Sequence, residues 1–313
     1  MLIQDKKKWP FPTSVDSTML HAYRSCPQQF YLSYIRRIRA AGTNTHFVCG
    51  GAFAKGLEVA RRQYVQTTQL GVPAILAAEK AMEAGLLALI TAYGDHEPSE
   101  KNKNKDWLNT AKAYVSYLDK WPLHSDYIKV SSFHEKPAVE FTFALELPVT
   151  NPTTGMPIFY AGRLDWIGEY NGLLLAMDEK TTRYFKSEWA SDWVLRAQFT
   201  GYVYACRQYN IPAAGYGIRG TALKMTEIEH QEAIITIPEW RLQRWWLQTI
   251  RDVTRMVENW HQDYYDFNLG DACTSYNGCP FVQLCKVEEP ETWIEAGDYV
   301  ENTWSPLMKE GDA

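Results

Sequence analysis

The chain has 313 residues, of which 46% are hydrophobic and 14% aromatic, a composition typical of a globular protein and not of a disordered one. The length fits one large domain or one domain with a helical addition. No apolar run approaches the length that spans a bilayer, and the first residues lack the apolar core of a secretory signal. We therefore expect a cytoplasmic protein that does not insert into a membrane.

The acidic charge is concentrated at the end of the chain. The net charge is −5, but eight acids and only two lysines follow Cys285, which leaves the preceding body at +1. A near-neutral body can still carry a basic groove, so the charge balance does not exclude a DNA partner. Two groups are candidate phosphate contacts, and either can also be an ordinary solvated surface: Arg36, Arg37 and Arg39, and, in a polar loop, Lys101, Lys103 and Lys105.

Helical patterns dominate the first part of the chain. Ser17 or Thr18 can cap a first helix. Pro27 suits the first turn of a second helix, and Cys26 then lies at the junction of the two. The second helix is expected to carry Phe30, Tyr31, Tyr34, Ile35 and Ile38. Further helices are predicted over 51–68, 73–92 and 104–120. We expect an N-terminal helical region over residues 1–130.

Strand patterns follow the helical region. Strands are predicted over 138–147, 158–168, 172–181, 214–224 and 230–237. One helix is predicted between the third and fourth strands, and a tryptophan-rich helix over 238–261 ends this part. The mixture predicts an α/β core over 131–262, followed by a cysteine-containing segment and acidic tail over 263–313.

The most informative stretch is a buried strand that ends in charged residues. Five apolar residues in a row are followed by Asp178, Glu179 and Lys180. On a strand Asp178 and Lys180 point the same way and Glu179 points the other way, and Asp165 comes from the preceding strand. Two carboxylates and an ammonium at one sheet edge suit a divalent metal, a phosphate and an activated water. A solvent-exposed strand end with a surface ion pair is the ordinary alternative.

A glutamine and a tyrosine follow in a segment of helical pattern. Gln198 and Tyr202 are four residues apart, so their side chains share one face of the helix. Next to a metal site they could hydrogen-bond a phosphate oxygen or hold the lysine in place. Alternatively, Tyr202 belongs to the core and Gln198 is its solvated neighbour.

Four of the six cysteines form a pattern: Cys273, Cys279 and Cys285 are spaced C-x5-C-x5-C, and Cys26 lies far upstream. In a reducing cytosol, clustered cysteines are metal ligands more often than disulfides. Zinc sites favour shorter loops between paired ligands, whereas long loops with one distant ligand suit an iron–sulfur cluster better. The two remaining cysteines are expected to be packing residues: Cys49 and Cys206.

Taken in order, these motifs resemble the PD-(D/E)XK nuclease superfamily, and in particular its RecB-like branch, from about residue 17 to residue 285. The matching residues are Asp165 as the first acid, Asp178, Glu179 and Lys180 as the D/E-x-K element, and Gln198 and Tyr202 as the Q-x-x-x-Y motif. The resemblance implies a restriction-endonuclease-like core, which is a mixed central sheet flanked by helices.

The resemblance also implies roles for these residues. Asp165 and Asp178 are expected to hold Mg²⁺ or Mn²⁺, with the Glu179 carbonyl as a further ligand. Lys180 is expected to orient or deprotonate the attacking water and to offset charge on the phosphate. The glutamine and the tyrosine of the Q-x-x-x-Y motif are expected to position the DNA strand.

Iron–sulfur nucleases of this branch, including the AddB type and CRISPR-adaptation nucleases, have one N-terminal and three C-terminal cysteines. The resemblance therefore implies a 4Fe-4S cluster held by Cys26, Cys273, Cys279 and Cys285, with zinc as the alternative metal. Several relatives space the last three cysteines more tightly, so the match is to the plan more than to the spacing.

The upstream helix departs from the family at one position. Relatives read G-x-x-F-H-x-x-x-E there, and the histidine is a metal ligand, whereas this chain has Ala54 at the position of the histidine. The site then keeps oxygen donors only, which leaves Mg²⁺ or Mn²⁺ as suitable ions. Glu58, one turn further along, could add a carboxylate directly or through water. Whether the alanine is natural or introduced stays open.

Two functions follow from these expectations. The first is a metal-dependent DNA nuclease, an exonuclease or end-processing enzyme that acts on single-stranded DNA or DNA ends in phage or prokaryotic recombination or repair. The second is a DNA-end-binding or assembly subunit that keeps the fold but has a weakened site, with Ala54 as the visible lesion. A structural zinc protein without nuclease activity is a third possibility. The sequence does not identify a protein partner.

Overall fold

The computed structural model describes residues 9–133, 136–274, 278–302 and 304–307, and the chain forms two compact units. The sheet unit comprises Thr43–Thr142 and Arg163–Leu242, and the cysteine unit comprises Met1–Gly42, Phe143–Gly162 and Gln243–Ala313. Both units are discontinuous in sequence, whereas the three segments expected from the sequence are consecutive. That division along the chain stays a prediction.

A mixed sheet forms the centre of the sheet unit. β8 (Leu173–Thr182) pairs antiparallel with β7 (Pro157–Tyr170) and parallel with β9 (Ala213–Leu223), and β10 (Ile228–Thr236) pairs antiparallel with β9. Three short strands and one long strand complete the pairing: β3 (Lys129–Val130) and β6 (Val139–Thr150) on β7, and β4 (Ser132–Phe133) with β5 (Lys136–Pro137). The apolar run predicted as a buried strand is therefore the central strand β8.

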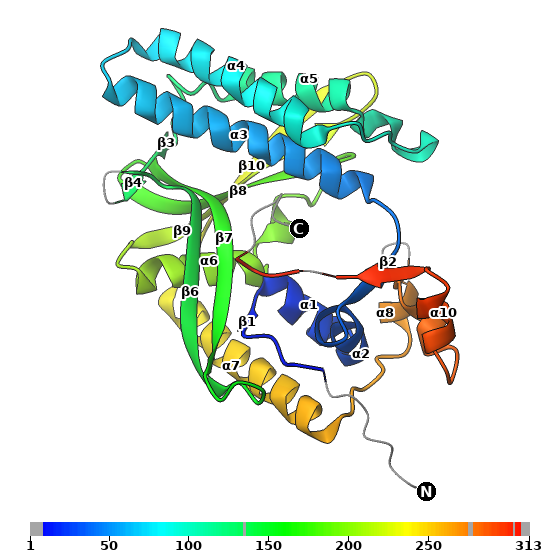
Figure 1. The fold of residues 1–313 in the computed structure, drawn as a ribbon. Helices are drawn as coiled ribbons and strands as arrows, with labels where there is room; N and C mark the ends of the chain where they lie inside the picture. The colour runs from blue at the N-terminus through cyan, green and yellow to red at the C-terminus, as the bar shows by residue number, and fades with distance from the viewer. Residues whose placement is uncertain (1–8, 134–135, 275–277, 303, 308–313) are drawn as a thin grey trace, which may run out of the picture. The chain divides into compact units, whose positions relative to one another are not determined.

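Helices cover both faces of this sheet, as Figure 1 shows. The long helices α3 (Thr45–Gln69), α4 (Ala74–Tyr93) and α5 (Trp107–Lys120) lie on one face, and α6 (Ala197–Gln208) lies on the other. Two short 3-10 helices connect these elements. η2 (Glu100–Lys105) lies between α4 and α5, and η3 (Ser191–Trp193) lies between β8 and α6. The predicted α/β class with a mixed sheet flanked by helices is confirmed. In the described stretches, no helix combines the length and the apolar character needed to cross a membrane.

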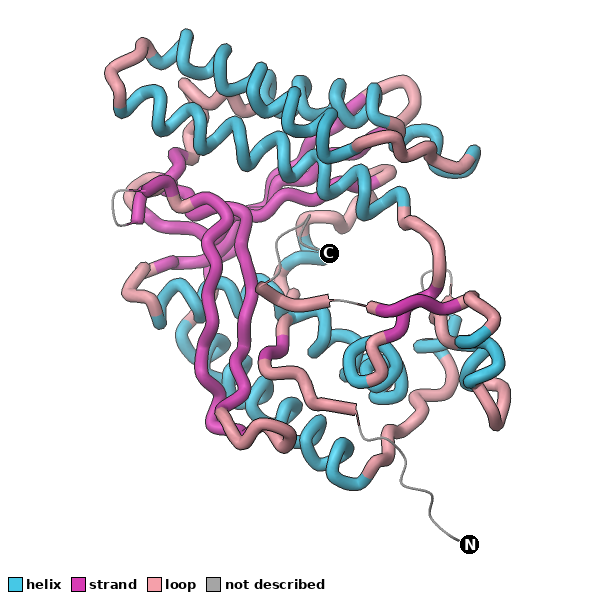
Figure 2. Tube along the Cα trace, in the orientation of Figure 1, coloured by secondary structure: helices cyan, strands magenta, loops and turns pink. Residues whose placement is uncertain are grey.

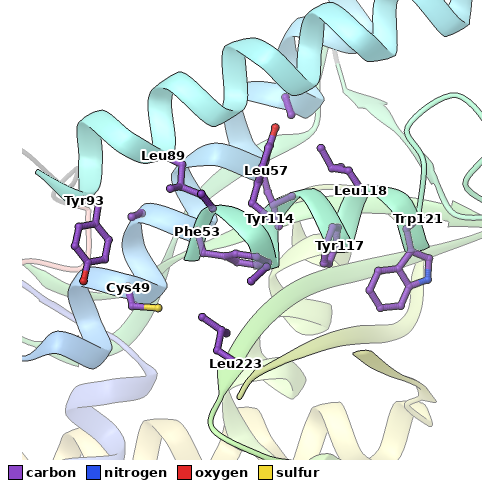
Figure 3. Close-up of a cluster of buried hydrophobic side chains, with 14 residues drawn as sticks. Cys49, Phe53, Leu57, Leu89, Tyr93, Tyr114, Tyr117, Leu118, Trp121 and Leu223 are labelled. Atoms are coloured by element: carbon purple, nitrogen blue, oxygen red, sulfur yellow. The ribbon is translucent and has the colours of Figure 1, made fainter. Parts of the chain in front are cut away.

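The three long helices share a core of apolar and aromatic side chains. Phe53 and Leu57 of α3 meet Leu89 of α4 and Tyr114 of α5, and all four are buried (Figure 3). The helices α3 and α4 run side by side (Figure 2), and their closest approach requires a glycine. A Cβ atom at Gly85 would lie 2.5 Å from the backbone oxygen of Gly56. This packing fixes the position of α3, the helix whose Arg61 pairs with Glu179 of β8.

The cysteine unit contains short elements from both ends of the chain. They are β1 (Ser14–Val15), α1 (Ser17–Ser25), α2 (Pro27–Phe30), the π-helix η1 (Tyr31–Ile35), β2 (Ile38–Ala40), most of α7 (Glu239–Gln262), α8 (Asp271–Thr274), α9 (Val282–Cys285), α10 (Glu291–Glu295) and β11 (Tyr299–Glu301). The cap of α1 is Asp16, which accepts a hydrogen bond of 2.8 Å from the backbone N–H of Met19. The prediction of Ser17 or Thr18 as the cap is therefore wrong by one or two positions.

Contacts between the two ends of the chain hold the cysteine unit together. β2 pairs antiparallel with β11, so Ile38 lies in a strand and not in the predicted second helix. Ile38 and Leu32 share a buried cluster with Phe281 and Tyr299. Arg24 of α1 also forms an ion pair of 2.7 Å with Asp252 of α7. These contacts place the Cys26 junction in the same unit as the C-terminal cysteines.

Candidate active site

The two predicted acids lie together because β7 and β8 pair in a single register. Trp166 lies opposite Met177 in the antiparallel ladder, and Asp165 and Asp178 are the next residues along the two strands. Asp165 Oδ2 accepts a hydrogen bond of 2.8 Å from the backbone N–H of Glu179. The register that aligns the apolar parts of the strands therefore also sets the acids side by side.

Lys180 completes the group on the same face of β8. Its Nζ atom forms an ion pair with Asp178 Oδ2 and lies 5.7 Å from the centre of the Phe199 ring on α6. The Asp178 side chain is 2% exposed and the Lys180 side chain is 35% exposed. Solvent therefore reaches the group through the lysine, while the carboxylate stays buried.

The charges in this group perturb one another. Burial raises the pKa of Asp165 well above its usual value, and the Asp178 and Glu179 carboxylates raise it further. Burial also raises the pKa of Asp178, although Lys180 opposes that effect. Burial acts to lower the pKa of Lys180, but the two aspartates outweigh it and raise this pKa. Two buried carboxyl groups thus share one ammonium, so ionisation of both is unfavourable without a further cation.

The donors at this end of the sheet fit a hard divalent cation. Mg²⁺ is usually held by one or two carboxylates, and it keeps several waters and binds substrate phosphates. Asp165 and Asp178 supply two carboxyl groups with only one lysine beside them. Across the described residues, no group of three or more His, Cys, Asp or Glu side chains is arranged to hold a metal ion. The remaining ligands of a bound cation would therefore be water, a backbone carbonyl or phosphate.

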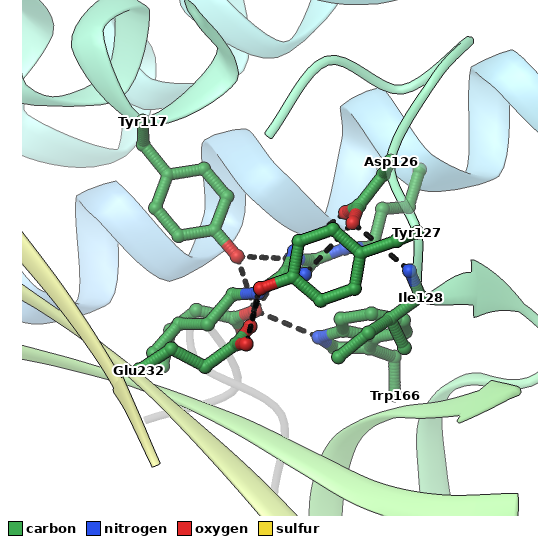
Figure 4. Close-up of polar contacts among 9 residues, drawn as sticks. Tyr117, Asp126, Tyr127, Ile128, Trp166 and Glu232 are labelled. Carbon is green, nitrogen blue, oxygen red and sulfur yellow. Dashed lines mark hydrogen bonds and ion pairs between the residues drawn. The ribbon is translucent and has the colours of Figure 1, made fainter. Parts of the chain in front are cut away.

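Glu179 lies between Asp178 and Lys180 along β8, so it points to the opposite face of the strand, where it enters a buried network. Figure 4 shows Tyr117 and Trp166, which belong to this network. The Glu179 carboxylate pairs with Arg61 of α3 and accepts hydrogen bonds from the Tyr117 hydroxyl at 3.0 Å and the Trp166 indole N–H at 2.7 Å. The Arg61 and Glu179 side chains are 4% and 2% exposed. Burial acts to raise the pKa of Glu179, but the Arg61 guanidinium outweighs it and holds this pKa below its usual value.

This network fixes the segment that carries the acids. The Glu179 side chain is anchored to α3 and α5, and the Glu179 backbone N–H holds the Asp165 carboxylate. The Glu179 carboxylate therefore lies on the opposite face of β8 from Asp178, and only its carbonyl stays a predicted metal ligand. Sequence reasoning did not find Arg61, because no local pattern links it to a strand more than a hundred residues away.

A second buried arginine supports the same face of the sheet. Arg219 of β9 lies opposite Glu179 in the parallel ladder. Its guanidinium donates hydrogen bonds to Asp126 at 2.6 and 2.8 Å and to Glu232 at 2.7 Å. Figure 4 shows its two carboxylate partners, Asp126 and Glu232, together with Tyr127. Each buried guanidinium thus has carboxylate partners, as burial of a charge requires.

Gln198 and Tyr202 share one face of α6, as their spacing predicts. Gln198 Nε2 donates a hydrogen bond of 2.8 Å to the Tyr202 hydroxyl, and Tyr202 is 6% exposed. Phe199, which follows Gln198 directly, stacks against Tyr216 of β9 and lies beneath the Lys180 ammonium. The helix that carries the glutamine and tyrosine is therefore packed on the same side of β8 as the acids.

The upstream helix α3 presents Glu58 to basic neighbours on the same helix. Glu58 forms ion pairs with Lys55 at 2.9 Å and with Arg62 at 3.1 Å. Ala54, which stands at the position expected for a histidine, is half-buried on this helix. A role for Glu58 as a metal ligand stays a prediction.

The two basic groups proposed as phosphate contacts are not equally exposed. Lys105 is 3% exposed, and burial lowers its pKa. The prediction of Lys105 as a surface phosphate contact is therefore wrong, whereas Lys101 and Lys103 are exposed. In the cysteine unit, Arg36 pairs with Glu291 at 2.9 Å.

The four patterned cysteines gather within the cysteine unit. Burial raises the pKa of Cys279, and the Cys26 and Cys273 thiols contribute to that rise. Burial and the other three thiols raise the pKa of Cys285 to about 11. The Cys26 thiol also accepts a hydrogen bond of 3.5 Å from the backbone N–H of Asn268. Thiols from both ends of the chain therefore lie close enough to affect the pKa of Cys279 and of Cys285. None of the four cysteines forms a disulfide.

The two remaining cysteines are placed as expected. Cys49 belongs to the buried helical core and Cys206 is fully buried on α6.

Two carboxylates and a lysine thus meet at one end of the paired strands β7 and β8 in a mixed sheet flanked by helices. The family model of the PD-(D/E)XK nuclease superfamily matches residues 17–286, and the chain belongs to this superfamily. The family indicates a nuclease, and its members usually use Mg²⁺ or Mn²⁺.

Other comparisons add little to this assignment. No curated protein matches the chain. Among solved structures, one described as "Crystal structure of SSO0001" is similar over 78% of this chain and 96% of its own, with 14% identity and a TM-score of 0.30.

Proposed function

We propose that the chain is a metal-dependent DNA nuclease, either an exonuclease or an end-processing enzyme, that acts on single-stranded DNA or DNA ends in phage or prokaryotic recombination or repair. The observation that carries the proposal is the meeting of Asp165, Asp178 and Lys180 at one end of the β7–β8 ladder. Assignment to the RecB-like branch is supported by the Q-x-x-x-Y pair and by the plan of the cysteines.

The residues on this face of β8 suit hydrolysis of a phosphodiester. Bound Mg²⁺ or Mn²⁺ supplies Lewis-acid polarisation of the phosphate and lowers the pKa of a bound water. Asp165 and Asp178 hold the cation. Lys180 orients or deprotonates the attacking water and offsets charge on the phosphate. Gln198 and Tyr202 position the DNA strand.

Cleavage of labelled oligonucleotides tests this function. The purified protein is incubated with single-stranded and blunt-ended DNA in Mg²⁺ or Mn²⁺, with EDTA as the control. We expect Mn²⁺-dependent shortening of the single strand that EDTA abolishes. Absence of cleavage in both metals, with both substrates, would contradict the proposed activity.

The alanine at position 54 favours a second candidate function. A chain that binds DNA ends but has a weakened site would bind the oligonucleotides and leave them intact. The same assay on Ala54→His separates the two functions. Cleavage that appears only in Ala54→His supports the weakened subunit, whereas equal cleavage by both proteins supports the nuclease.

We further propose that Cys26, Cys273, Cys279 and Cys285 hold a 4Fe-4S cluster, with zinc as the alternative metal. The effect of the Cys26, Cys273 and Cys279 thiols on the pKa of Cys285 supports this assignment, because it links thiols from both ends of the chain. A metal group held by these thiols cross-links the first and last parts of the cysteine unit, so its binding free energy contributes to folding.

Replacing Cys279 by alanine tests the cluster. We expect Cys279→Ala to be colourless and poorly soluble, because one of four ligands is lost and the two ends are no longer joined. The matched control is Cys206→Ala, which removes a buried thiol outside the set and should keep the colour. The measurements are visible absorbance and metal analysis after anaerobic purification. Soluble, active Cys279→Ala that lacks the absorbance would contradict the structural role of the cluster. Stoichiometric zinc in the wild-type protein would show that zinc, and not iron, is the metal that the four cysteines hold.

A further inference from the structure

A basic cavity opens in the sheet unit beyond the end of β8. Its volume is about 350 Å³. It is lined by residues of η2, of the segment after β8 and of the segment after β9: Glu100, Lys101, Lys103, Asn104, Arg183, Tyr184, Lys224 and Met225. None of the residues to which the active-site roles are assigned belongs to this lining.

The lining carries more cations than acids. Four of its side chains are cationic and one is acidic. Lys103 pairs with Glu100 at 2.6 Å, and Lys224 pairs with Glu227 at 2.7 Å and with Glu229 at 2.5 Å. Lys101 and Arg183 are exposed and enter no ion pair among the residues that the structure describes. These two cations can therefore take an anionic ligand without first breaking a salt bridge.

The walls of the cavity are held together by hydrogen bonds. The buried Asn104 side chain donates a hydrogen bond of 2.5 Å to the backbone oxygen of Leu223, the last residue of β9. Asn109 of α5 donates one of 3.1 Å to the backbone oxygen of Lys224. The Thr182 hydroxyl donates one of 3.1 Å to the backbone oxygen of Tyr184. The cations are thus presented on supported backbone and not on a free loop.

Only a short stretch of chain separates the cavity from the acids. Arg183 follows Lys180 by three residues along the chain, which spans at most about 10 Å. Next to Arg183, Tyr184 is 55% exposed, and Met225 is 70% exposed. An exposed aromatic ring in the same lining as cations is the combination that binds single-stranded nucleic acids, since the ring stacks on a base and the cations contact the backbone.

We propose that this cavity binds the sugar–phosphate backbone and one base of a single nucleic-acid strand, one or two nucleotides from the bond that is cut. Lys101 and Arg183 contact phosphates, and Tyr184 stacks on the base. The inference rests on the proposed nuclease function for its substrate, but its test measures binding alone.

The test uses fluorescence anisotropy of a labelled single-stranded oligonucleotide with the full chain in EDTA, over a series of salt concentrations. For Lys101→Gln/Arg183→Gln we expect affinity about tenfold weaker at low salt and a salt slope smaller by about 1.4, because each lost phosphate contact on a single strand removes about 0.7. For Tyr184→Ala we expect affinity about fivefold weaker or more, with an unchanged salt slope. The matched control, Lys80→Gln/Lys112→Gln, removes two exposed lysines of α4 and α5 and should bind like the wild type.

The outcomes separate this inference from the nuclease function. Wild-type affinity and salt slope in both cavity variants would overturn the inference even if the wild type cuts DNA. An equal loss in the control variant would also overturn it, because it would show a general charge effect. A reduced slope in the double variant, together with a wild type that does not cut, would support the binding site and count against the nuclease.

Discussion

Lys180→Met is expected to abolish Mn²⁺-dependent cleavage of single-stranded DNA while the protein stays folded. Methionine keeps much of the length of the side chain but removes the charge that we propose offsets the phosphate and orients water. Loss of one such group typically costs a factor of about 10²–10³ in rate. The Lys180 side chain is 35% exposed, so its replacement removes little packing. Initial rates of oligonucleotide cleavage, with circular dichroism for the fold, provide the measurement.

Lys186→Met is the matched control for this variant. Lys186 is exposed in the segment after β8, six residues beyond Lys180, and it contacts none of the acids. We expect it to cleave like the wild type. If folded Lys180→Met cleaved at the wild-type rate, Lys180 would have no catalytic role.

Arg61→Met is expected to lower the free energy of unfolding by about 3–5 kcal/mol, because it leaves Glu179 buried without its counter-charge. Arg61 also donates a hydrogen bond of 2.9 Å to the Tyr117 hydroxyl and lies 4.4 Å from the centre of the Trp166 ring. The pKa of Glu179 is lowered in the folded protein, so the contribution of the pair is present at neutral pH and is lost as pH falls below about 4.5. Urea unfolding at pH 7 measures the change.

The neighbouring Arg62 provides a control on the same helix. Its side chain is 38% exposed, so Arg62→Met should cost about 1 kcal/mol or less. The double variant Arg61→Met/Glu179→Gln should be more stable than Arg61→Met, since it no longer buries an unpaired charge. Equal stability losses in Arg61→Met and Arg62→Met would show that the buried pair does not hold β8 in place.

The central strand and its charged end could be predicted because their signals are local. A run of apolar residues indicated β8, and alternation along a strand placed Asp178 and Lys180 on one face and Glu179 on the other. The predicted range 172–181 agrees with the observed Leu173–Thr182 to within one residue at each end. The four-residue spacing of Gln198 and Tyr202 likewise predicted that the two side chains share one face of a helix, as they do on α6.

The features that sequence patterns missed depend on contacts between distant segments. Ile38 lies in a strand because β2 pairs with β11 from the far end of the chain, which no local pattern encodes. Lys105 was expected on a polar loop, but its backbone oxygen accepts a hydrogen bond of 2.6 Å from the buried Tyr93 hydroxyl, which draws the residue into the helical core. Arg61 likewise shows its role only through the fold, because its partner Glu179 is on another element.

The most direct test of the site is the location of Mn²⁺ in crystals of the protein soaked with that ion, found by anomalous diffraction. We expect an anomalous peak coordinated by one carboxylate oxygen from each of Asp165 and Asp178, and no peak there in crystals of Asp178→Asn. Mn²⁺ bound elsewhere, with the space between these two carboxylates empty at saturating metal, would contradict the proposed site.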